Sequence, residues 1–476
     1  MLRQWQDECI HTALLKYQLG QTNFLAMATP GAGKTHMAAH LTSRLFELDK
    51  IDLVVCFTPS VSVTNSFQSS LESVTSKKMN GKLGSSGQVL TYHHLSFLSN
   101  SFWQIFNQHR VFVIFDEIHH CGGQDINLSN VWGEKILRNI RSRAAYTLAL
   151  SGTPWRSDKL PIALAHYSGD PSRLQCDYTY SLAQAISDKV CRTPKVVAID
   201  NNHIHYTDSA GQSTNYNNIQ QLLANTDVSY SDLLCHETIV TYILKQAMNR
   251  LQRTRQLNPR AAGLIVASSV SHAYWIRDIL FEKLKQKSVI VTHGDSSSHA
   301  TIKNFECSDA QWIIAIGMIS EGTNIPRLQV CCYLSRVKTE LYFRQVLGRI
   351  VRSRDEKYRF AYLYTLAEET LLDYAKRIGE DLPGELTVVE IHQMDDATGL
   401  QEPIKINEKT IEIEPKLLQF SDSNITMPSS EGVDNYNNST LNESSTETVV
   451  NRSHYSLSGQ FSEELITLHN AFNEAC

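Results

Sequence analysis

Short apolar runs alternate with longer segments of helical character along most of the chain. Runs of strand length lie at residues 24–27, 53–57, 111–115 and 146–150, and a second series lies at 264–267, 289–291, 312–316, 330–334 and 360–364. Continuously apolar strands are typical of parallel sheets that helices cover on both faces. The pattern therefore predicts an α/β fold, and its two series predict two separate sheets, each in its own domain.

The composition between and after these series sets the expected domain boundaries. Residues 200–225 are rich in Asn, Gln, Ser and Thr, which indicates a polar connector or insertion, and a helical segment follows around residues 231–256. We therefore expect a first domain at 1–198, a polar segment at 199–230, a second domain at 231–384 and an acidic tail at 385–476.

The tail differs from the body in charge and in apolar content. From residue 381 onwards the chain holds 17 Asp and Glu against 4 Lys and Arg, whereas the rest holds 32 against 40. A positive body is compatible with a polyanionic partner. Residues 421–458 carry few apolar groups, which predicts disorder. Apolar side chains then recur at helical spacing and predict a helix over residues 461–475, which either packs on its own chain or docks a protein partner.

Length and composition exclude several classes of protein. The 476 residues are enough for two or three domains with their own cores. No stretch approaches the roughly 18 apolar residues of a membrane span, and the N-terminus lacks the apolar segment of a signal peptide, so we expect a cytoplasmic protein with no membrane partner. The ten cysteines include no C-x-x-C pair, and they therefore give no zinc or iron–sulfur signature.

The segment after the first apolar run has the features of a phosphate-binding loop. Gly31 and Gly33 stand between a strand and a helix, where backbone N–H groups can approach phosphate oxygens. Lys34 would neutralise the β- and γ-phosphates of ATP, and the Thr35 hydroxyl would bind Mg²⁺. The expected nucleotide contacts in this loop are Thr29, Pro30, Gly31, Ala32, Gly33, Lys34 and Thr35.

An acid pair follows the third apolar run. Asp116 and Glu117 would reach the carboxyl edge of the sheet, where open α/β sheets bind ligands. We expect Asp116 to hold Mg²⁺, and Glu117 to orient and deprotonate the attacking water. The hydrogen-bonding groups nearby are expected to couple the acid pair to the state of the nucleotide, and they are His119, Ser151 and Thr153.

The second domain contributes a loop and a pair of arginines. The loop at residues 317–326 supplies small groups suited to phosphate or sugar contacts, among them Gly322 and Asn324. Arg349 and Arg352 lie one helical turn apart, so both can face one cleft. Gln345 begins the same segment and is expected to be a further coupling residue. The planar fork of arginine binds phosphate through two parallel hydrogen bonds. The pair is expected to stabilise charge on the γ-phosphate from across the cleft.

In order and approximate spacing, these motifs resemble those of superfamily 2 helicases of the DExH type, in the branch of XPB-like, UvsW-like and type I or III restriction motors. The resemblance covers about residues 1–380 and implies two RecA-like domains with ATP bound in the cleft between them. It implies that Gln6, near Arg3, reads the adenine. It also implies nucleic-acid contacts at Thr58, Pro59, Ser60, Thr91, Tyr92, Ser268, His293, Gly294 and Thr323.

The chain departs from the family pattern at two positions. Ala28 replaces the first glycine of the strict phosphate-loop pattern, a change that helicase loops commonly show, and Asn324 stands where many relatives carry Asp. The resemblance implies an enzyme that couples hydrolysis of ATP, with Mg²⁺, to movement on nucleic acid, with DNA favoured over RNA. Two alternatives stay open, namely a duplex DNA translocase that serves a restriction, modification or repair partner, and a nucleotide-switched clamp without useful turnover.

Overall fold

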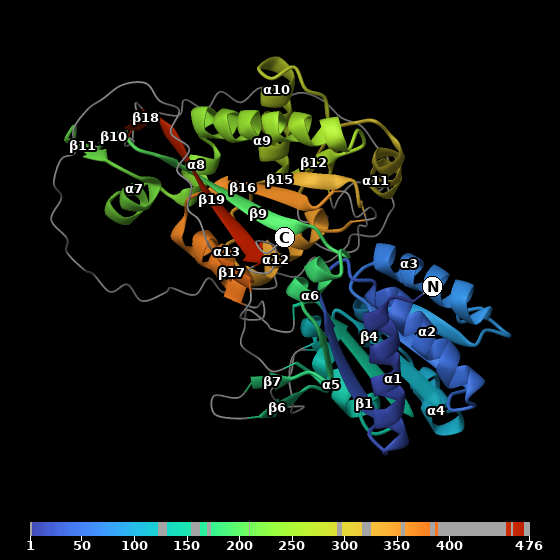
Figure 1. Cartoon of the computed structure of the whole chain (residues 1–476). Coiled ribbons are helices and arrows are strands. Elements are labelled where there is room, and N and C mark those ends of the chain that lie inside the picture. Colours follow the sequence, from blue (N-terminus) through green and yellow to red (C-terminus); the bar gives the residue numbers. More distant parts are fainter. Residues whose placement is uncertain are drawn as a thin grey trace, which may run out of the picture.

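A computed structural model describes residues 2–121, 131–153, 162–168, 173–208, 210–292, 298–316, 325–353, 358–380, 386–388, 454–457 and 460–470. Figure 1 shows two α/β domains, with helix α6 (Leu182–Ser187) at their junction. The expected fold class of two tandem parallel-sheet domains is confirmed. None of the helices in these residues is long and apolar enough to cross a lipid bilayer.

The first domain is built on a parallel sheet with the strand order β3-β2-β4-β5-β1-β8. The four apolar runs expected to be strands are among its members. The strands are β1 (Asn23–Ala28), β2 (Leu53–Thr58), β3 (Gly87–Thr91), β4 (Val111–Asp116), β5 (Tyr146–Ser151) and β8 (Tyr178–Tyr180). A small antiparallel pair, β6 (His166–Ser168) and β7 (Arg173–Gln175), lies outside this sheet.

Helices cover both faces of the first sheet, which is why its strands are apolar at nearly every position. Alternate residues of β4 enter different cores: Phe112 and Ile114 pack in one, and Val113 and Phe115 in the other. The first core is completed by α1 (Gln4–Gln18), α2 (Lys34–Glu47) and α3 (Val61–Thr75). The second is completed by α4 (Asn100–Gln108), α5 (Val131–Asn139) and the 3₁₀ turn η1 (Tyr92–Ser96).

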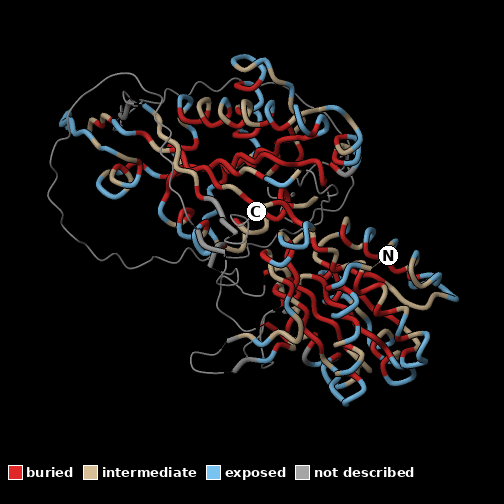
Figure 2. Tube along the Cα trace, viewed as in Figure 1, coloured by how far each residue is buried: buried red, intermediate tan, exposed pale blue. Residues whose placement is uncertain are grey.

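The second domain has a larger sheet with the order β13-β14-β12-β15-β16-β9-β19-β17. All its pairings from β13 to β9 are parallel, and β19 and β17 join antiparallel. The strands are β9 (Thr193–Asn201), β12 (Ala262–Ala267), β13 (Ser288–Val291), β14 (Trp312–Ala315), β15 (Leu328–Leu334), β16 (Phe360–Leu366), β17 (Leu386–Val388) and β19 (Phe461–Asn470). Figure 2 shows that the strands of both sheets lie among the most buried parts of the chain.

The helices of the second domain lie on both sides of its sheet. In Figure 1, α9 and α10 lie on one side, and α12 and α13 lie on the other, toward the first domain. The helices are α7 (Ile219–Asn225), α8 (Tyr230–Leu234), α9 (Glu237–Leu257), α10 (Val270–Glu282), α11 (Ser298–Cys307), α12 (Glu340–Ile350) and α13 (Glu369–Glu380). The expected helical segment at 231–256 is thus two helices, interrupted at residues 235–236.

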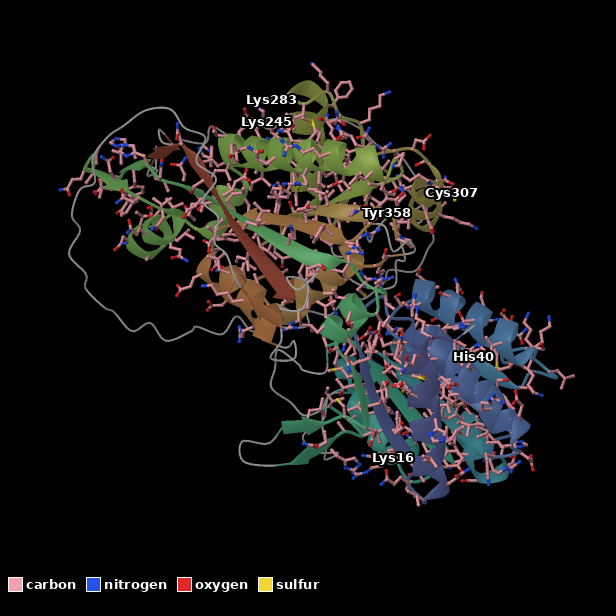
Figure 3. The ribbon with its side chains drawn as sticks, in the orientation of Figure 1. Lys16, His40, Lys245, Lys283, Cys307 and Tyr358 are labelled. Carbon is pink, nitrogen blue, oxygen red and sulfur yellow. The ribbon has the colours of Figure 1, made fainter. Side chains whose placement is uncertain are left out.

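Ion pairs between side chains fasten helices to neighbouring elements in both domains. Lys16 of α1 pairs with Asp177, which also accepts a hydrogen bond from the Leu25 N–H, so the pair ties α1 to the sheet. Lys283 pairs with Glu237 and joins the end of α10 to the start of α9. Lys16 and Lys283 are both labelled in Figure 3, on the first and second domain respectively.

The structure moves the expected boundary between the domains. We expected the first domain to end at residue 198, but residues 193–201 form β9, which pairs in parallel with β16 of the second sheet. The run from Val196 to Ile199 is a buried strand, and the second sheet supplies the neighbour that buries it. The polar segment at 199–230 is likewise not a bare connector, because it folds into β10 (Ile204–Thr207), β11 (Ser213–Tyr216) and α7.

The end of the chain also differs from expectation. The helix expected at 461–475 is wrong for the described residues 461–470, which form strand β19. β19 pairs with β9 from Phe461 opposite Asn201 to Thr467 opposite Lys195, so this pairing overrides the helical spacing of the apolar residues. Of the segment expected to be disordered, residues 454–457 form β18 beside β10, and residues 421–453 lie outside the described residues.

Candidate nucleotide-binding site

The phosphate loop connects the end of β1 to the start of α2. Gly31 and Gly33 have positive φ angles of 87° and 102°, a region that costs other residues strain. They also permit close contacts: a Cβ on Gly33 would lie 2.8 Å from Gln6 Nε2, and one on Gly31 would lie 2.6 Å from Arg352 Cγ. The loop is therefore enclosed by side chains from α1 and from the second domain.

Two residues of the N-terminal segment bind the backbone of this loop. Gln6 is buried, and its amide donates to the Gly33 carbonyl at 2.9 Å while its Oε1 accepts the Arg3 N–H at 2.9 Å. The Arg3 guanidinium donates to the Ala32 carbonyl at 2.5 Å. Trp5 stacks on Tyr180 with ring centroids 4.8 Å apart, which holds the start of α1 against β8. Both residues expected near the adenine thus lie at the loop.

The Lys34 side chain reaches from the start of α2 to the acid pair. Lys34 is buried, and its ammonium donates to the Ala28 carbonyl at 3.0 Å and lies 3.4 Å from a Glu117 oxygen. The Glu117 backbone has φ 53° and ψ 55°, in the left-handed region that a residue other than glycine rarely adopts. Such local strain is found where a structure holds a functional group in place.

The charge of Glu117 is stabilised by several neighbours. Burial raises the pKa of Glu117, but the Lys34 ammonium, the two following histidines and a hydrogen bond from the Gly152 N–H outweigh that effect and lower it to about 2. The Gly152 N–H lies 3.2 Å from Glu117 Oε2, and His119 Nδ1 lies 3.5 Å from the same oxygen. Glu117 is therefore an anion at neutral pH, which a general base requires.

The residues expected to couple the acid pair to its surroundings form one connected group. His119 is buried and its Nδ1 lies 3.0 Å from the Ser151 hydroxyl, which also accepts the Thr153 N–H at 3.1 Å. Ser151 ends β5, the neighbour of β4 in the sheet, so the two strands deliver these groups to the same edge. Through His119, the state of Glu117 is linked to the turn after β5.

The second domain contributes its arginines to the same cavity. This cavity has a volume of about 310 Å³ and is lined by Pro30, Gly31, Gly33, Lys34, Thr35, His36, Pro59, Val63, Ser66, Ser70, Asp116, Glu117, Gly152, Thr153, Gln345, Arg349 and Arg352. Arg349 is buried, and burial lowers the pKa of Arg352. The two domains touch beside the cavity, since a Cβ on Gly348 would lie 2.5 Å from Pro30 Cβ.

The chemistry of the donors fits Mg²⁺. Thr35, Asp116 and Glu117 line the cavity together, and a hydroxyl with carboxylates is the oxygen donor set that Mg²⁺ prefers. Asp116 is 7% exposed at the end of β4, next to the phosphate loop, so it could hold a cation that also contacts phosphate. The expected catalytic, metal and coupling residues are thus brought to one place.

The finger helix, α12, which carries Arg349 and ends just before Arg352, is held by a residue that no sequence motif marks. Arg192 is buried just before β9, and its guanidinium donates to the carbonyls of Leu328, Ile350 and Pro326 at 3.0 to 3.1 Å, and also to that of Arg352. It therefore joins the start of β9 to the end of α12 and the start of β15. A single arginine before a strand carries no motif, so only the structure finds it.

The residues expected to contact nucleic acid are placed unevenly. Ser60 caps α3, Ser268 lies just before α10, and both are partly exposed. Pro59 lines the nucleotide cavity instead. The Thr58, Thr91 and Tyr92 side chains are buried, so the contact with nucleic acid expected at these residues stays a prediction that their main chain or their exposed neighbours would have to meet. His293, Gly294 and Thr323, the other residues expected to contact nucleic acid, lie outside the described residues, as do Gly322 and Asn324, which were expected to bind the nucleotide.

Known proteins resemble the chain over this site and beyond it. Residues 1–156 match the family described as "Type III restriction enzyme, res subunit". An uncharacterised protein of Mycobacterium leprae is 33% identical over 367 residues, covering 74% of this chain and 60% of its own length. One of Mycobacterium tuberculosis is 31% identical over 374 residues, covering 74% and 59%. The chain thus spans about 60% of the length of these curated relatives.

The fold has a counterpart among solved structures. A fragment described as the HsdR subunit of a type I restriction enzyme from Vibrio vulnificus superposes with a TM-score of 0.56 and 17% identity, covering 80% of this chain and 67% of that one. At this identity the likeness concerns the fold alone. The family match covers the phosphate loop and the acid pair, and the fold extends to the domain that carries the arginines. The resemblance to superfamily 2 helicases, in the group that includes restriction-enzyme motors, is therefore confirmed for the part of the chain that carries the phosphate loop and the acid pair.

Proposed function

We propose that this chain is an ATP- and Mg²⁺-dependent motor that moves along nucleic acid, with DNA favoured over RNA. The observation that carries the proposal is the single cavity lined both by the phosphate loop and acid pair of the first domain and by the arginines of the second. Catalytic groups that come from two domains act together only when the cleft is closed, so each cycle of hydrolysis can drive closure and opening.

The side chains divide the work of hydrolysis between them. Lys34, which lies 3.4 Å from Glu117, would turn to the β- and γ-phosphates when ATP enters. Glu117 would then accept a proton from the attacking water, and Arg349 and Arg352 would stabilise the charge that develops on the γ-phosphate. A Mg²⁺ held by Thr35 and Asp116 would neutralise phosphate charge.

Movement along nucleic acid requires a contact on each domain. Ser60 caps α3, and Ser268 directly precedes Ser269, the cap of α10, so both lie near helix N-termini, where backbone N–H groups are suited to phosphate oxygens. Backbone contacts of this kind make binding largely independent of sequence and sensitive to salt. The preference for DNA rests on the restriction enzymes among the similar proteins. A cytoplasmic location remains a prediction of the sequence.

The proposal is tested by ATP hydrolysis with different nucleic acids. The purified chain is assayed with single-stranded DNA, duplex DNA, forked DNA and RNA in parallel, and Glu117→Gln serves as the blank. We expect Mg²⁺-dependent hydrolysis that DNA stimulates more than RNA and that the blank lacks. Equal rates of hydrolysis in the wild type and in Glu117→Gln would reject the catalytic role of Glu117. A wild type that binds ATP but does not hydrolyse it with any of the nucleic acids would favour the alternative of a nucleotide-switched clamp.

A duplex translocase is the second candidate, because the chain shares its fold with a subunit described as part of a type I restriction enzyme. Two assays separate it from a helicase. A helicase displaces a strand from forked DNA in the presence of ATP, whereas a translocase leaves the fork paired and displaces a third strand bound to a duplex. Displacement of the fork strand alone would reject the translocase.

A further inference from the structure

Tyr92 connects the segment expected to contact nucleic acid with the metal-binding acid. It directly follows Thr91, at the start of η1, and its side chain is fully buried. Its hydroxyl donates to the main-chain carbonyl of Asp116 at 2.8 Å. A buried hydrogen bond of this kind fixes the position of both partners, because an unpaired carbonyl in the interior is costly. The end of β4 is thus fastened to η1.

The Tyr92 ring belongs to a series of aromatic contacts at the same edge of the sheet. Its centroid lies 6.4 Å from that of Phe57 at an interplanar angle of 18°, and Phe57 lies 5.8 Å from Phe115 at 17°. Trp132 of α5 also stacks on Tyr92, with ring centroids 5.6 Å apart at an interplanar angle of 20°. Closely packed rings transmit displacement because the interior leaves little free volume for them to move independently.

Three rings of this series, Phe57, Phe115 and Tyr92, are adjacent in sequence to a functional segment. Phe57 precedes Thr58 and the partly exposed Ser60, Phe115 precedes Asp116, and Tyr92 begins η1. η1 itself is exposed to solvent at His93 and His94, and the Thr91 hydroxyl lies 2.8 Å from His94 Nδ1. A ligand on η1 therefore touches a segment whose buried side directly holds the backbone of the acid pair.

We propose that Tyr92 is a positioning residue through which nucleic acid bound at η1 sets the geometry of Asp116 and Glu117. The Glu117 backbone is the part that responds, because its φ of 53° is strained and is maintained by the neighbouring groups. A small shift of the Asp116 carbonyl, which is the acceptor of the Tyr92 hydroxyl, changes the backbone directly before Glu117. Since Tyr92 does not reach the surface, it acts on the reaction only through the acid pair. This inference rests on the proposed function, in which nucleic acid stimulates hydrolysis.

The test compares two substitutions that each remove one buried hydroxyl. Tyr92→Phe keeps the ring and its stacking but removes the hydrogen bond to Asp116. Tyr17→Phe is the matched control, because the Tyr17 hydroxyl is also buried and donates to a strand carbonyl, that of Thr147, at 2.8 Å. Thr147 lies in β5, and Tyr17 is at the far end of α1 from Gln6. The readouts are ATP hydrolysis with and without single-stranded DNA, DNA affinity and thermal unfolding.

We expect the two variants to lose similar amounts of stability but to differ in stimulation. In Tyr92→Phe the ratio of the DNA-stimulated to the basal rate of ATP hydrolysis should fall by about fivefold, which is the effect expected from the loss of one hydrogen bond. The affinity for DNA should be retained. In Tyr17→Phe the ratio should match that of the wild type. An unchanged ratio in Tyr92→Phe, or an equal fall in both variants, would overturn the inference while DNA stimulation of the wild type still supports the proposed function. A wild type that no nucleic acid stimulates would reject both.

Discussion

The Lys34 ammonium and the Glu117 carboxylate lie 3.4 Å apart, so the cation of the phosphate loop and the proposed general base hold each other in place before a nucleotide binds. This arrangement keeps Glu117 ionised. In the proposed function, the phosphates of ATP would pair with Lys34 and so free the Glu117 carboxylate to bind the attacking water. Both residues come from the same sheet edge, whereas the arginines come from the other domain.

Replacement of Lys34 should therefore separate folding from hydrolysis. In Lys34→Ala we expect the rate of ATP hydrolysis to fall by about 100-fold or more, since the phosphate charge loses its nearest cation. The substitution leaves the apolar cores unchanged, so circular dichroism should show the wild-type helix and strand content. Hydrolysis within a few fold of the wild type would show that Lys34 does not act on the phosphates.

The low pKa of Glu117 predicts a specific dependence of stability on pH. The carboxyl titrates near 4.5 in the unfolded chain and at about 2 in the folded one, so its ion pair stabilises the fold fully above pH 4.5. That contribution decreases as the pH falls from 4.5 toward 2. Because Gln does not titrate, thermal unfolding of Glu117→Gln should lose less stability than the wild type over this range. Parallel curves for the two proteins would contradict the assigned ion pair.

Gly348 tests whether the domains meet as described. A helical Gly→Ala change normally favours the helix by about 1 kcal/mol, but here the new Cβ would lie 2.5 Å from Pro30 Cβ across the cleft. In Gly348→Ala we expect thermal stability equal to or above that of the wild type together with a fall in ATP hydrolysis of about tenfold, as the arginines are held away from the phosphates. Wild-type hydrolysis would show that α12 and the phosphate loop do not approach this closely at Gly348 and Pro30.

Arg192 should support the arginine fingers without touching the nucleotide. Arg192→Lys keeps a charge but cannot reach the carbonyls of Pro326, Leu328 and Ile350 together, and we expect a loss of about 2 to 3 kcal/mol in unfolding free energy. ATP hydrolysis should fall as well, because the end of α12 is no longer fixed. The buried Arg327 is the control: it donates to the Arg260 and Ala310 carbonyls, so Arg327→Lys should cost stability but retain hydrolysis. Equal rates of ATP hydrolysis in Arg192→Lys and Arg327→Lys would reject the role of Arg192 in supporting the arginines of the finger helix.

Features that depend on neighbours in sequence could be predicted, and they include most of the strands and the phosphate loop. Gly31 and Gly33 need positive φ angles because of the turn they form, and Asp116 ends a strand that is apolar on both faces. These requirements are local, so the residue types reveal them. The α/β class follows from the same local patterns.

Features that depend on distant partners could not be predicted. From the sequence alone, β9 continues the first domain, and only its pairing with β16 assigns it to the second sheet. Likewise, the sequence indicates no partner for the Tyr92 hydroxyl, which in the structure lies 2.8 Å from the Asp116 main-chain carbonyl oxygen. Sequence spacing also cannot distinguish a motif residue that faces solvent from one that is buried, which is why the burial of the Thr58 and Thr91 side chains was not foreseen. Non-local pairing decides these cases.

An aromatic contact holds the last strand, β19, on the sheet of the second domain, and this contact can be tested. Phe461 of β19 stacks on Tyr242 of α9 with ring centroids 4.3 Å apart at 19°, and the Tyr242 hydroxyl donates to Glu463 at 3.3 Å. Phe461→Ala should lower the unfolding free energy by about 1 to 2 kcal/mol, since it removes the stacked pair and part of the apolar contact that holds β19 on the edge of β9.

A matched control comes from the same domain. Phe281 of α10 is 59% exposed, so Phe281→Ala removes an equal side chain that contributes little to the core. Thermal unfolding should separate the two variants, whereas ATP hydrolysis at a temperature where both are folded should equal that of the wild type, because β19 lies at the opposite side of β9 from β16 and the finger helix follows β15. Equal stability of Phe461→Ala and Phe281→Ala would show that β19 does not complete the sheet, and the edge of β9 would then be open to another strand.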